Sequence, residues 1–285
     1  MLFPFFEKKA FGKYSLFVLL LLITSKCPLP GQDLLSVKGA RYAGMGGCSV
    51  ALSGFWNINS NQAGMARVRK FSAGINYEDR FGMSQLSTKS IAVLYPARFG
   101  VMGASLDYFG YSLYHETKFG LAYAKAITPH LRAGLKLDFF QTAFGDHYSG
   151  NNLLTFELGF QYDLSKNFAF GADIFNPIPK SGPSEVYFNL PLIYRFGLVY
   201  LFSKNLLVTA EVDKNSDLPF YEVRAGVEYA VRNRYFFRVG LGSQQEIFTT
   251  GFGYKWKRLS FDLAAVVHQA LGISPQISLI YSFGS

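Results

Sequence analysis

Residues 221–242, YEVRAGVEYAVRNRYFFRVGLG, alternate between two kinds of side chain. Every second residue of the first half is apolar or aromatic. The positions between them carry four charges, at Glu222, Arg224, Glu228 and Arg232. A period of two residues is that of a β-strand whose two faces meet different surroundings. In water a second sheet would have to cover the apolar face, whereas in a bilayer that face would contact lipid.

The same alternation recurs in fourteen segments after residue 69. A strand that crosses a bilayer needs about 9–11 residues, whereas soluble strands are typically about 5–6 residues long. No apolar run after residue 31 is long enough for a membrane helix. We therefore predict an all-β fold, a 14-stranded antiparallel transmembrane β-barrel over residues 70–285. The expected strands are 70–78, 86–95, 99–110, 116–127, 131–142, 152–164, 167–176, 191–202, 205–214, 221–231, 235–243, 247–256, 259–268 and 275–284.

The connections between these segments alternate in length. Links from an even-numbered segment to the next one are short, as in PAR (96–98) and KR (257–258). Links from an odd-numbered segment are often longer, as in EDRFGMSQ (78–85) and GYSLYHE (110–116). Bacterial outer-membrane barrels have short periplasmic turns and longer outer loops. The pattern therefore predicts that the short turns face the periplasm, and an even strand number places both ends of the barrel there.

Residues 1–31 are expected to form a signal peptide. Three lysines precede LFVLLLLI (16–23), an apolar run that is too short to span a bilayer. Cleavage near Gly31-Gln32 would export the chain by the general secretory route toward the outer membrane of a Gram-negative bacterium. A lipoprotein leader ending at Cys27 is an alternative, although the adjacent Lys26 is not the usual small residue.

Residues 32–69 break the alternation and are rich in Gly, Ala, Ser and Asn. The wall side chains of a fourteen-stranded barrel cannot fill its bore, since about eight strands is the limit for that. We therefore predict that this segment forms an N-terminal hatch inside the lumen, where its small residues let its backbone approach the wall closely. GMGG (44–47) has the spacing of neither common nucleotide-binding loop, and no βαβ unit follows it.

Two motifs in this segment resemble the N-terminal hatch of the FadL-like outer-membrane β-barrel superfamily. They are GARYAGMGGCSVAL (39–52) and NSNQAGMA (59–66). That superfamily includes fatty-acid and aromatic-hydrocarbon transporters and the PorV/PorQ-type proteins of type IX secretion, and its barrels have fourteen strands. Cys48, Gln62 and Met65 replace the alanine, proline and leucine that the family usually has there. The resemblance assigns these hatch-motif residues: Arg41, Gly44, Met45, Gly46, Gly47, Asn61, Gln62, Ala63 and Gly64.

The polar faces of the strands are predicted to line the lumen. Opposite charges fall on neighbouring strands, which leaves two interpretations open: ion pairs that hold the hatch, or a polar path that selects solutes. Apolar positions on the same faces, such as Phe140 and Val199, would allow an apolar pocket instead. The candidate lumen-facing polar residues are Arg132, Lys136, Asp138, Arg195, Glu211, Asp213, Glu222, Arg224, Glu228, Arg238, Lys255, Asp262 and His268.

The sequence contains no arrangement of residues that indicates catalysis or metal binding. Its four histidines are scattered, and only Cys48 remains once the leader is removed. Removal of the leader also lowers the net positive charge, and no basic cluster typical of nucleic-acid binding remains. We therefore expect no enzymatic activity, no metal or other cofactor and no nucleic-acid partner.

Two functions are consistent with a plugged barrel. The first is a passive channel for a small, hydrophobic molecule that the hatch gates. The alternative is a PorV/PorQ-like accessory barrel of a type IX secretion or surface-attachment complex. The expected partners are outer-membrane lipid and lipopolysaccharide, the barrel assembly machinery during insertion, and either a small hydrophobic ligand or secretion-complex subunits.

The two faces of the strands also predict the effect of substitutions. A glutamate at Val223 or Leu135 should block assembly, because a charge facing lipid is costly. The same change at Gly226 or Ser260 should be far milder, because these residues face the lumen.

Overall fold

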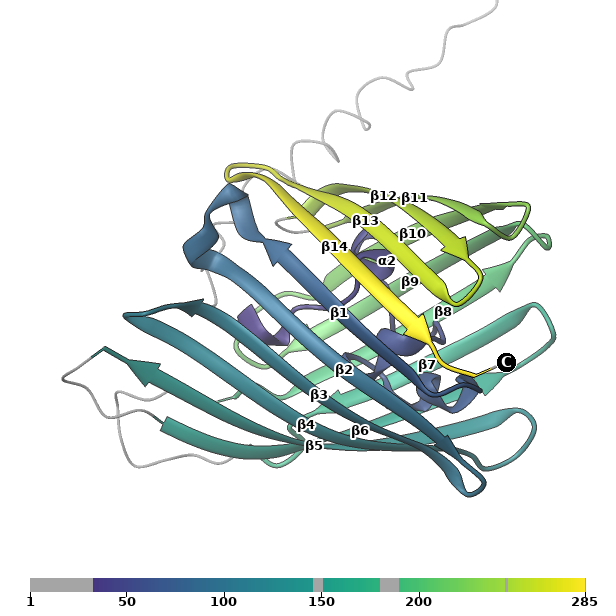
Figure 1. The fold of residues 1–285 in the computed structure, drawn as a ribbon, viewed down its shortest axis with the longest axis horizontal. Helices are drawn as coiled ribbons and strands as arrows, with labels where there is room; N and C mark the ends of the chain where they lie inside the picture. The colour runs from purple at the N-terminus through teal and green to yellow at the C-terminus, as the bar shows by residue number, and fades with distance from the viewer. Residues whose placement is uncertain (1–32, 146–150, 180–189, 244–245, 285) are drawn as a thin grey trace, which may run out of the picture. The chain divides into compact units, whose positions relative to one another are not determined.

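The computed structural model describes residues 33–145, 151–179, 190–243 and 246–284. Fourteen antiparallel strands form one sheet in chain order, which closes where β1 pairs with β14 (Figure 1). The predicted fourteen-stranded barrel is therefore confirmed, and each predicted segment overlaps one strand. The predicted signal peptide and its cleavage position lie outside the described residues. The strands are β1 Ser72–Asp79, β2 Ser87–Ala97, β3 Gly100–Tyr111, β4 Tyr114–Ala126, β5 Leu131–Phe144, β6 Asn151–Asp163, β7 Phe168–Phe175, β8 Ile193–Leu201, β9 Leu206–Asn215, β10 Glu222–Val231, β11 Tyr235–Gly242, β12 Glu246–Trp256, β13 Leu259–His268 and β14 Gly272–Ser282.

The outer face of the wall is apolar and exposed. On β10, Val223 and Tyr229 are each 48% exposed, whereas Glu228 between them is 6% exposed. The same contrast runs round the barrel, for example at Leu137 on β5 and Val239 on β11, which are 50% and 47% exposed. So much contiguous apolar surface is not stable in water, and a bilayer core is the surrounding that suits it.

Aromatic side chains gather on the outer face where the strands meet the short turns. The ring of Tyr200 lies 4.7 Å from that of Phe202, and the ring of Phe71 lies 4.9 Å from that of Phe283. Trp256, the last residue of β12, is 53% exposed. Aromatic girdles of this kind mark the interface between hydrocarbon and headgroups in membrane barrels.

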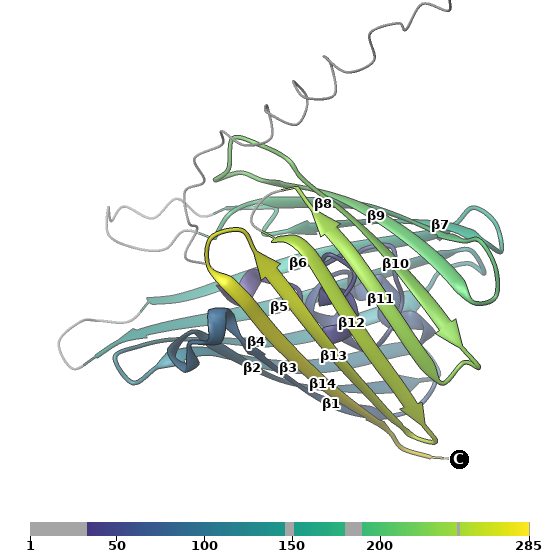
Figure 2. The same cartoon turned by 90° about the horizontal axis from the view of Figure 1, so that it is seen from above.

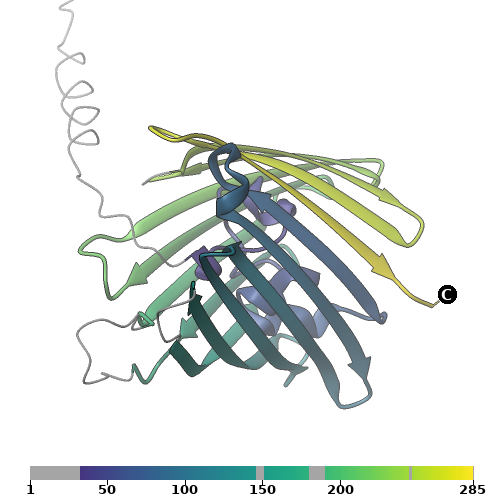
Figure 3. The same cartoon turned by 60° about the vertical axis from the view of Figure 1, so that its left-hand side comes forward.

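Residues 33–69 contain no strand and run through the interior of the barrel, as Figures 2 and 3 show in purple and dark blue. Four short helices lie in this N-terminal segment: η1 Asp33–Leu35, α2 Ala40–Ala43, η2 Phe55–Asn59 and η3 Gln62–Arg67. Two more, η4 Arg80–Gly82 and η5 Ser84–Leu86, lie in the loop between β1 and β2. Within the described residues, all helices are too short or too polar to cross a membrane.

We predict that Leu137→Arg, in the middle of β5, prevents folding into a bilayer, because a cation at mid-bilayer depth costs about 2–4 kcal/mol. Leu113→Arg is the matched control, since Leu113 is 65% exposed but lies between β3 and β4 rather than within a strand. The fraction of protein that migrates as the compact form in unheated gel samples measures folding. Equal folding of the two variants would contradict the membrane-facing assignment.

A charge at Val223 should disturb membrane insertion less than the sequence analysis predicted. It is the second residue of β10, so a charge there lies near one end of the strand. Leu135 is the fifth residue of β5 and is 42% exposed on the outer face, so it suits the test better.

Candidate functional site

The N-terminal segment contacts wall strands on different sides of the barrel. The helix α2 packs on β12, β13 and β14, η2 packs on β2 and β3, and η3 packs chiefly on β4, β5 and β6. An apolar cluster joins Tyr42, Trp56 and Met65 of the segment to Leu94 and Val101 of the wall. The segment therefore bridges the lumen from one side of the wall to another.

Glycines on the inner face mark the places where the segment lies closest to the wall. A Cβ atom on Gly171 would lie 2.1 Å from the Val50 carbonyl oxygen, and one on Gly240 would lie 2.1 Å from the Gly46 amide nitrogen. Any side chain at these positions would displace backbone atoms. A Cβ atom would also lie less than 3 Å from atoms of the segment at Gly134, Gly159 and Gly226.

The expectation of a mild effect at Gly226 is wrong. A Cβ atom there would lie 2.5 Å from the Met45 carbonyl oxygen, so even alanine would push on the segment. The residue does face the lumen, as predicted, but the segment already occupies that space.

The GMGG stretch lies against β10, β11 and β12. Met45 is fully buried, and a Cβ on Gly44 would lie 2.9 Å from Gly251 Cα. Gly46 and Gly47 have φ angles of +69° and +81°, a left-handed conformation that favours glycine. The Gly46 amide donates a hydrogen bond of 2.9 Å to Thr249 Oγ1. The glycines thus permit both the turn and its close contact with the wall.

Arg41 forms the first charged anchor between the segment and the wall. Its Nη2 and Nε lie 2.8 Å and 2.9 Å from the two carboxylate oxygens of Glu228 on β10. Arg238 Nε donates to the same carboxylate at 2.6 Å, and its Nη1 donates to Asp262 at 2.7 Å. Two arginines and two carboxylates therefore form one chain of ion pairs across β10, β11 and β13.

Glu211 on β9 forms a second anchor. Its Oε2 accepts hydrogen bonds from the backbone amides of Ser49 at 2.7 Å and Val50 at 2.9 Å. Arg224 on β10 lies 3.8 Å from the same carboxylate. Arg224 also pairs with the other acidic residues predicted for this face, Asp213 at 2.7 Å and Glu222 at 2.5 Å.

Asn61 connects the segment to β6 and to itself. Its Nδ2 donates to the carbonyl oxygens of Val50 at 2.8 Å and Phe160 at 2.9 Å. Its Oδ1 accepts from the Ala63 amide at 3.1 Å and so caps η3. Ala63 is fully buried, and a Cβ on Gly64 would lie 2.6 Å from Asn57 Cγ. The small size of Ala63 and Gly64 therefore allows η3 to pack closely against its neighbours.

Residues in and next to η3 also contact a cluster of buried charges on β5 and β6. Gln62 donates a hydrogen bond to the Glu157 carboxylate. Lys136 Nζ donates to Asn59 Oδ1 at 3.0 Å and lies 2.9 Å from Asp138 Oδ1. The predicted lumen residues Lys136 and Asp138 therefore form a pair beside the segment.

The remaining predicted residues are spread along the lumen. Arg132 pairs with Asp163 at 2.6 Å, and Asp163 also accepts from Arg67 of the segment at 2.6 Å. Arg195 pairs with Asp173 on β7 at 2.9 Å. The two other predicted residues, Lys255 and His268, lie away from these anchors.

Lys255 is exposed close to the turn between β12 and β13. His268 lies at the opposite end of the barrel, where its ring is 4.7 Å from that of Phe81 in the β1–β2 loop.

Several residues of the same network were not predicted. Gln161 donates to the carbonyl oxygens of Val50 and Leu52, and Asp107 accepts from Asn59. Lys118, Glu157 and Asp173 belong to this group as well. All of them lie on the polar faces of β3, β4, β6 and β7, so the alternation that identified the other residues also applied to them.

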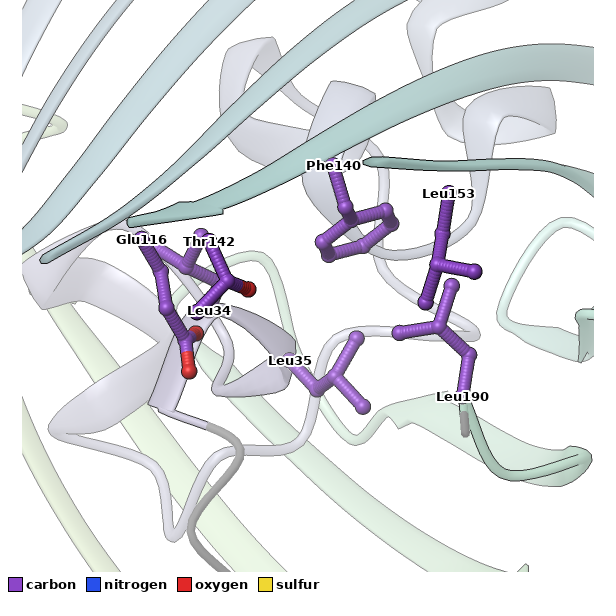
Figure 4. Close-up of a pocket in the computed structure, with 7 residues that line it drawn as sticks. All are labelled: Leu34, Leu35, Glu116, Phe140, Thr142, Leu153 and Leu190. Atoms are coloured by element: carbon purple, nitrogen blue, oxygen red, sulfur yellow. The ribbon is translucent and has the colours of Figure 1, made fainter. Parts of the chain in front are cut away.

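An apolar pocket lies where η1 meets β5 and β6 (Figure 4). The side chains of Leu35, Phe140, Leu153 and Leu190 surround it, and Leu34 completes its apolar lining. A carboxylate and a hydroxyl, from Glu116 and Thr142, form its polar edge. The Glu116 carboxylate accepts a hydrogen bond from the Tyr114 hydroxyl. Phe140, one of the apolar positions predicted to face the lumen, lies in this pocket.

No protein-family model and no curated protein matches the chain. Its fold is similar to those of outer-membrane transporters. The toluene transporter TbuX of Ralstonia pickettii has a TM-score of 0.68 at 15% identity, over 88% of this chain and 99% of that one. The Pseudomonas putida toluene transporter TodX has a TM-score of 0.66 at 13% identity, over 88% of this chain and 100% of that one. A FadL homologue of Pseudomonas aeruginosa has a TM-score of 0.64 at 12% identity, over 86% and 98%.

These similarities show that the chain has the fold of FadL-type outer-membrane barrels. The resemblance drawn from the two N-terminal motifs is therefore confirmed at the level of the fold. Two of the compared proteins are toluene transporters by name, and the third is a FadL homologue. A relationship to PorV/PorQ-type proteins stays a prediction.

We predict that Gly171→Ala loosens the segment, whereas Gly197→Ala does not. The two glycines pair across β7 and β8, but a Cβ on Gly197 would lie no closer than 3.2 Å to any atom. The overpacking caused by a methyl group at Gly171 should lower the free energy of unfolding by roughly 1–3 kcal/mol. Denaturant unfolding in detergent measures the difference, and equal stabilities would contradict the close approach at Val50.

We predict that Cys48 is unreactive while the protein is folded. Burial raises the pKa of the Cys48 thiol above its ordinary value, and the nearby Glu211 carboxylate raises it further. Because a higher pKa leaves less thiolate at pH 8, maleimide labelling should be slow in the folded protein and complete after unfolding. Rapid labelling of the folded protein would mean that the segment leaves its site readily.

Proposed function

We propose that this barrel is an outer-membrane passive channel for a small hydrophobic molecule and that the N-terminal segment gates it. The observation that carries the proposal is the apolar pocket between η1 and the wall, because the segment itself forms part of the pocket lining. The shared fold with toluene transporters supports the choice of a hydrophobic solute. We further propose that the chain reaches the outer membrane with its leader cleaved near Gly31-Gln32 and that the barrel assembly machinery inserts it.

The pocket fits the entry step of such a channel. It lies near the end of the barrel that carries the longer loops, which is the outer side for a bacterial barrel. Its leucines and Phe140 would cover an apolar molecule, and Glu116 with Thr142 would orient a polar group on it. Few polar groups in a largely apolar lining are typical of small-molecule sites.

The position of the segment supports the gating step. Leu34 and Leu35 touch the pocket, while α2, η2 and η3 bridge the lumen behind it. A solute that passes from the pocket to the turn side must therefore displace part of residues 33–69. Movement of the segment against its wall contacts is the step that would open the channel.

One observation favours a second function. Carboxylates and amides of the wall hold the segment at many points, among them Glu228, Glu211 and Gln161. A plug held this firmly also suits the PorV/PorQ-like alternative, in which the barrel stays closed and binds subunits of a secretion or surface-attachment complex.

A disulfide that locks the segment would separate the two functions. A Cβ on Gly197 would lie 3.4 Å from the Ala51 Cβ, close to the roughly 3.5–4.5 Å of natural disulfides. We predict that Ala51→Cys with Gly197→Cys, in a chain with Cys27→Ser and Cys48→Ser, blocks uptake of a hydrophobic dye such as N-phenylnaphthylamine by intact cells. Dithiothreitol should restore uptake, and the single-cysteine variants serve as controls.

Equal uptake in the oxidised and reduced states would contradict gating by the segment. Co-purification of other outer-membrane proteins with the locked barrel would then favour the accessory function. Dye uptake that is blocked by the oxidised disulfide and restored by dithiothreitol, together with a barrel that purifies without other proteins, would support the channel.

A further inference from the structure

The rim of the barrel at the short turns carries a ring of exposed cations. Every short turn contributes at least one positive side chain except the one between β4 and β5, where Lys125 lies just before the turn. Among the residues that the structure describes, Asp163 is the one acidic residue at this rim, and Arg132 and Arg67 already pair with it. The rim cations are Arg67, Arg69, Lys70, Arg98, Lys125, Lys166, Lys204, Arg232, Arg234, Lys255, Lys257 and Arg258, and all of them are exposed.

The backbone at two of these positions points to a role for the charge. Arg232 and Lys257 have φ angles of +53° and +52°, in the left-handed region. Glycine or asparagine adopts this conformation at lower cost, and both are the usual residues of such tight turns. The chain therefore places long cationic side chains where the turn geometry alone would favour small residues.

The cations also lie at a defined depth relative to the bilayer. They follow the exposed aromatic side chains that mark the edge of the hydrocarbon, for example Lys204 after Phe202 and Lys257 after Trp256. Lys257 Nζ lies 5.4 Å from the centre of the Trp256 ring. Lys125 is exposed on the outward-facing side of β4, two residues beyond Tyr123. This depth is that of lipid headgroups.

We propose that this ring binds the phosphate headgroups of anionic phospholipids in the leaflet that faces the short turns. The cations are distributed over the turns of the whole barrel rather than gathered on one side, which suits a shell of lipids better than one soluble acidic partner. Basic residues next to a membrane attract anionic headgroups, and the attraction weakens with salt. The proposal is independent of what the channel carries.

The two tryptophans allow a direct test. Trp56 is 2% exposed inside the barrel, whereas Trp256 is 53% exposed beside Lys257 and Arg258. Brominated lipids quench tryptophans that they touch, so quenching reports the lipids next to Trp256. The full chain is refolded into phosphatidylcholine vesicles that contain either brominated phosphatidylglycerol or brominated phosphatidylcholine. Trp256→Phe shows how much of the signal belongs to Trp256.

We predict that brominated phosphatidylglycerol is preferred at this site about fivefold at low salt, and that the preference falls toward one in about 1 M NaCl. The double variant Lys257→Gln with Arg258→Gln should lose most of the preference. Lys89→Gln is the matched control, because Lys89 is exposed on the outer face toward the opposite end and lies 5.8 Å from the Tyr108 ring. It should keep the full preference.

Equal quenching by the two lipids in the unmodified protein at low salt would overturn the proposal. The same holds for a preference that Lys89→Gln removes and the double variant keeps. Because the salt dependence is measured on the unmodified protein, the proposal can be tested even if the double variant does not fold.

Discussion

Closure of the hydrogen-bond ladder is the constraint on which the rest of this structure depends. A backbone amide or carbonyl without a partner in hydrocarbon costs several kcal/mol, so a sheet in a membrane cannot have a free edge. Here β1 pairs with β14 from Ser72 opposite Ser282 to Glu78 opposite Gln276. The amide of Phe283 continues the seam beyond the last strand by donating to Phe71 at 2.7 Å. Closure with fourteen strands leaves a bore that wall side chains alone do not fill.

The N-terminal segment fills this bore with polar contacts as well as apolar ones. Charges out of contact with water are costly unless hydrogen bonds and opposite charges surround them. Arg238 shows how the cost is met, because it lies between Glu228 and Asp262 while Glu228 also binds Arg41. The apolar cluster around Trp56 and Ile58 supplies burial in the same region. Wall and segment therefore form one packed interior.

The sequence predicted the strands well because their signal is local. Alternation over ten residues identifies a strand and its two faces, so Val239 could be assigned to lipid and Arg238 to the lumen without knowledge of any partner. The contacts of the candidate site are not local. Arg41 and Glu228 are 187 positions apart in the chain, and no short-range pattern relates them. The pocket likewise combines η1 with β4, β5, β6 and Leu190. Gly226 was misjudged for the same reason, since its neighbour Met45 comes from a distant segment.

The anchors of the segment also determine the electrostatics of the wall. Glu228, Glu211 and Glu157 receive donors from residues 41–62: a guanidinium, two backbone amides and a side-chain amide. The segment thus supplies hydrogen-bond donors to three wall carboxylates, and one of these donors, Arg41, also carries a positive charge. A barrel from which it has withdrawn is an electrolyte-filled pore in which these three carboxylates have lost the donors of the segment, while Glu228 and Glu211 keep their wall partners Arg238 and Arg224. Its conductance would favour cations, even though the apolar mouth above it favours uncharged molecules.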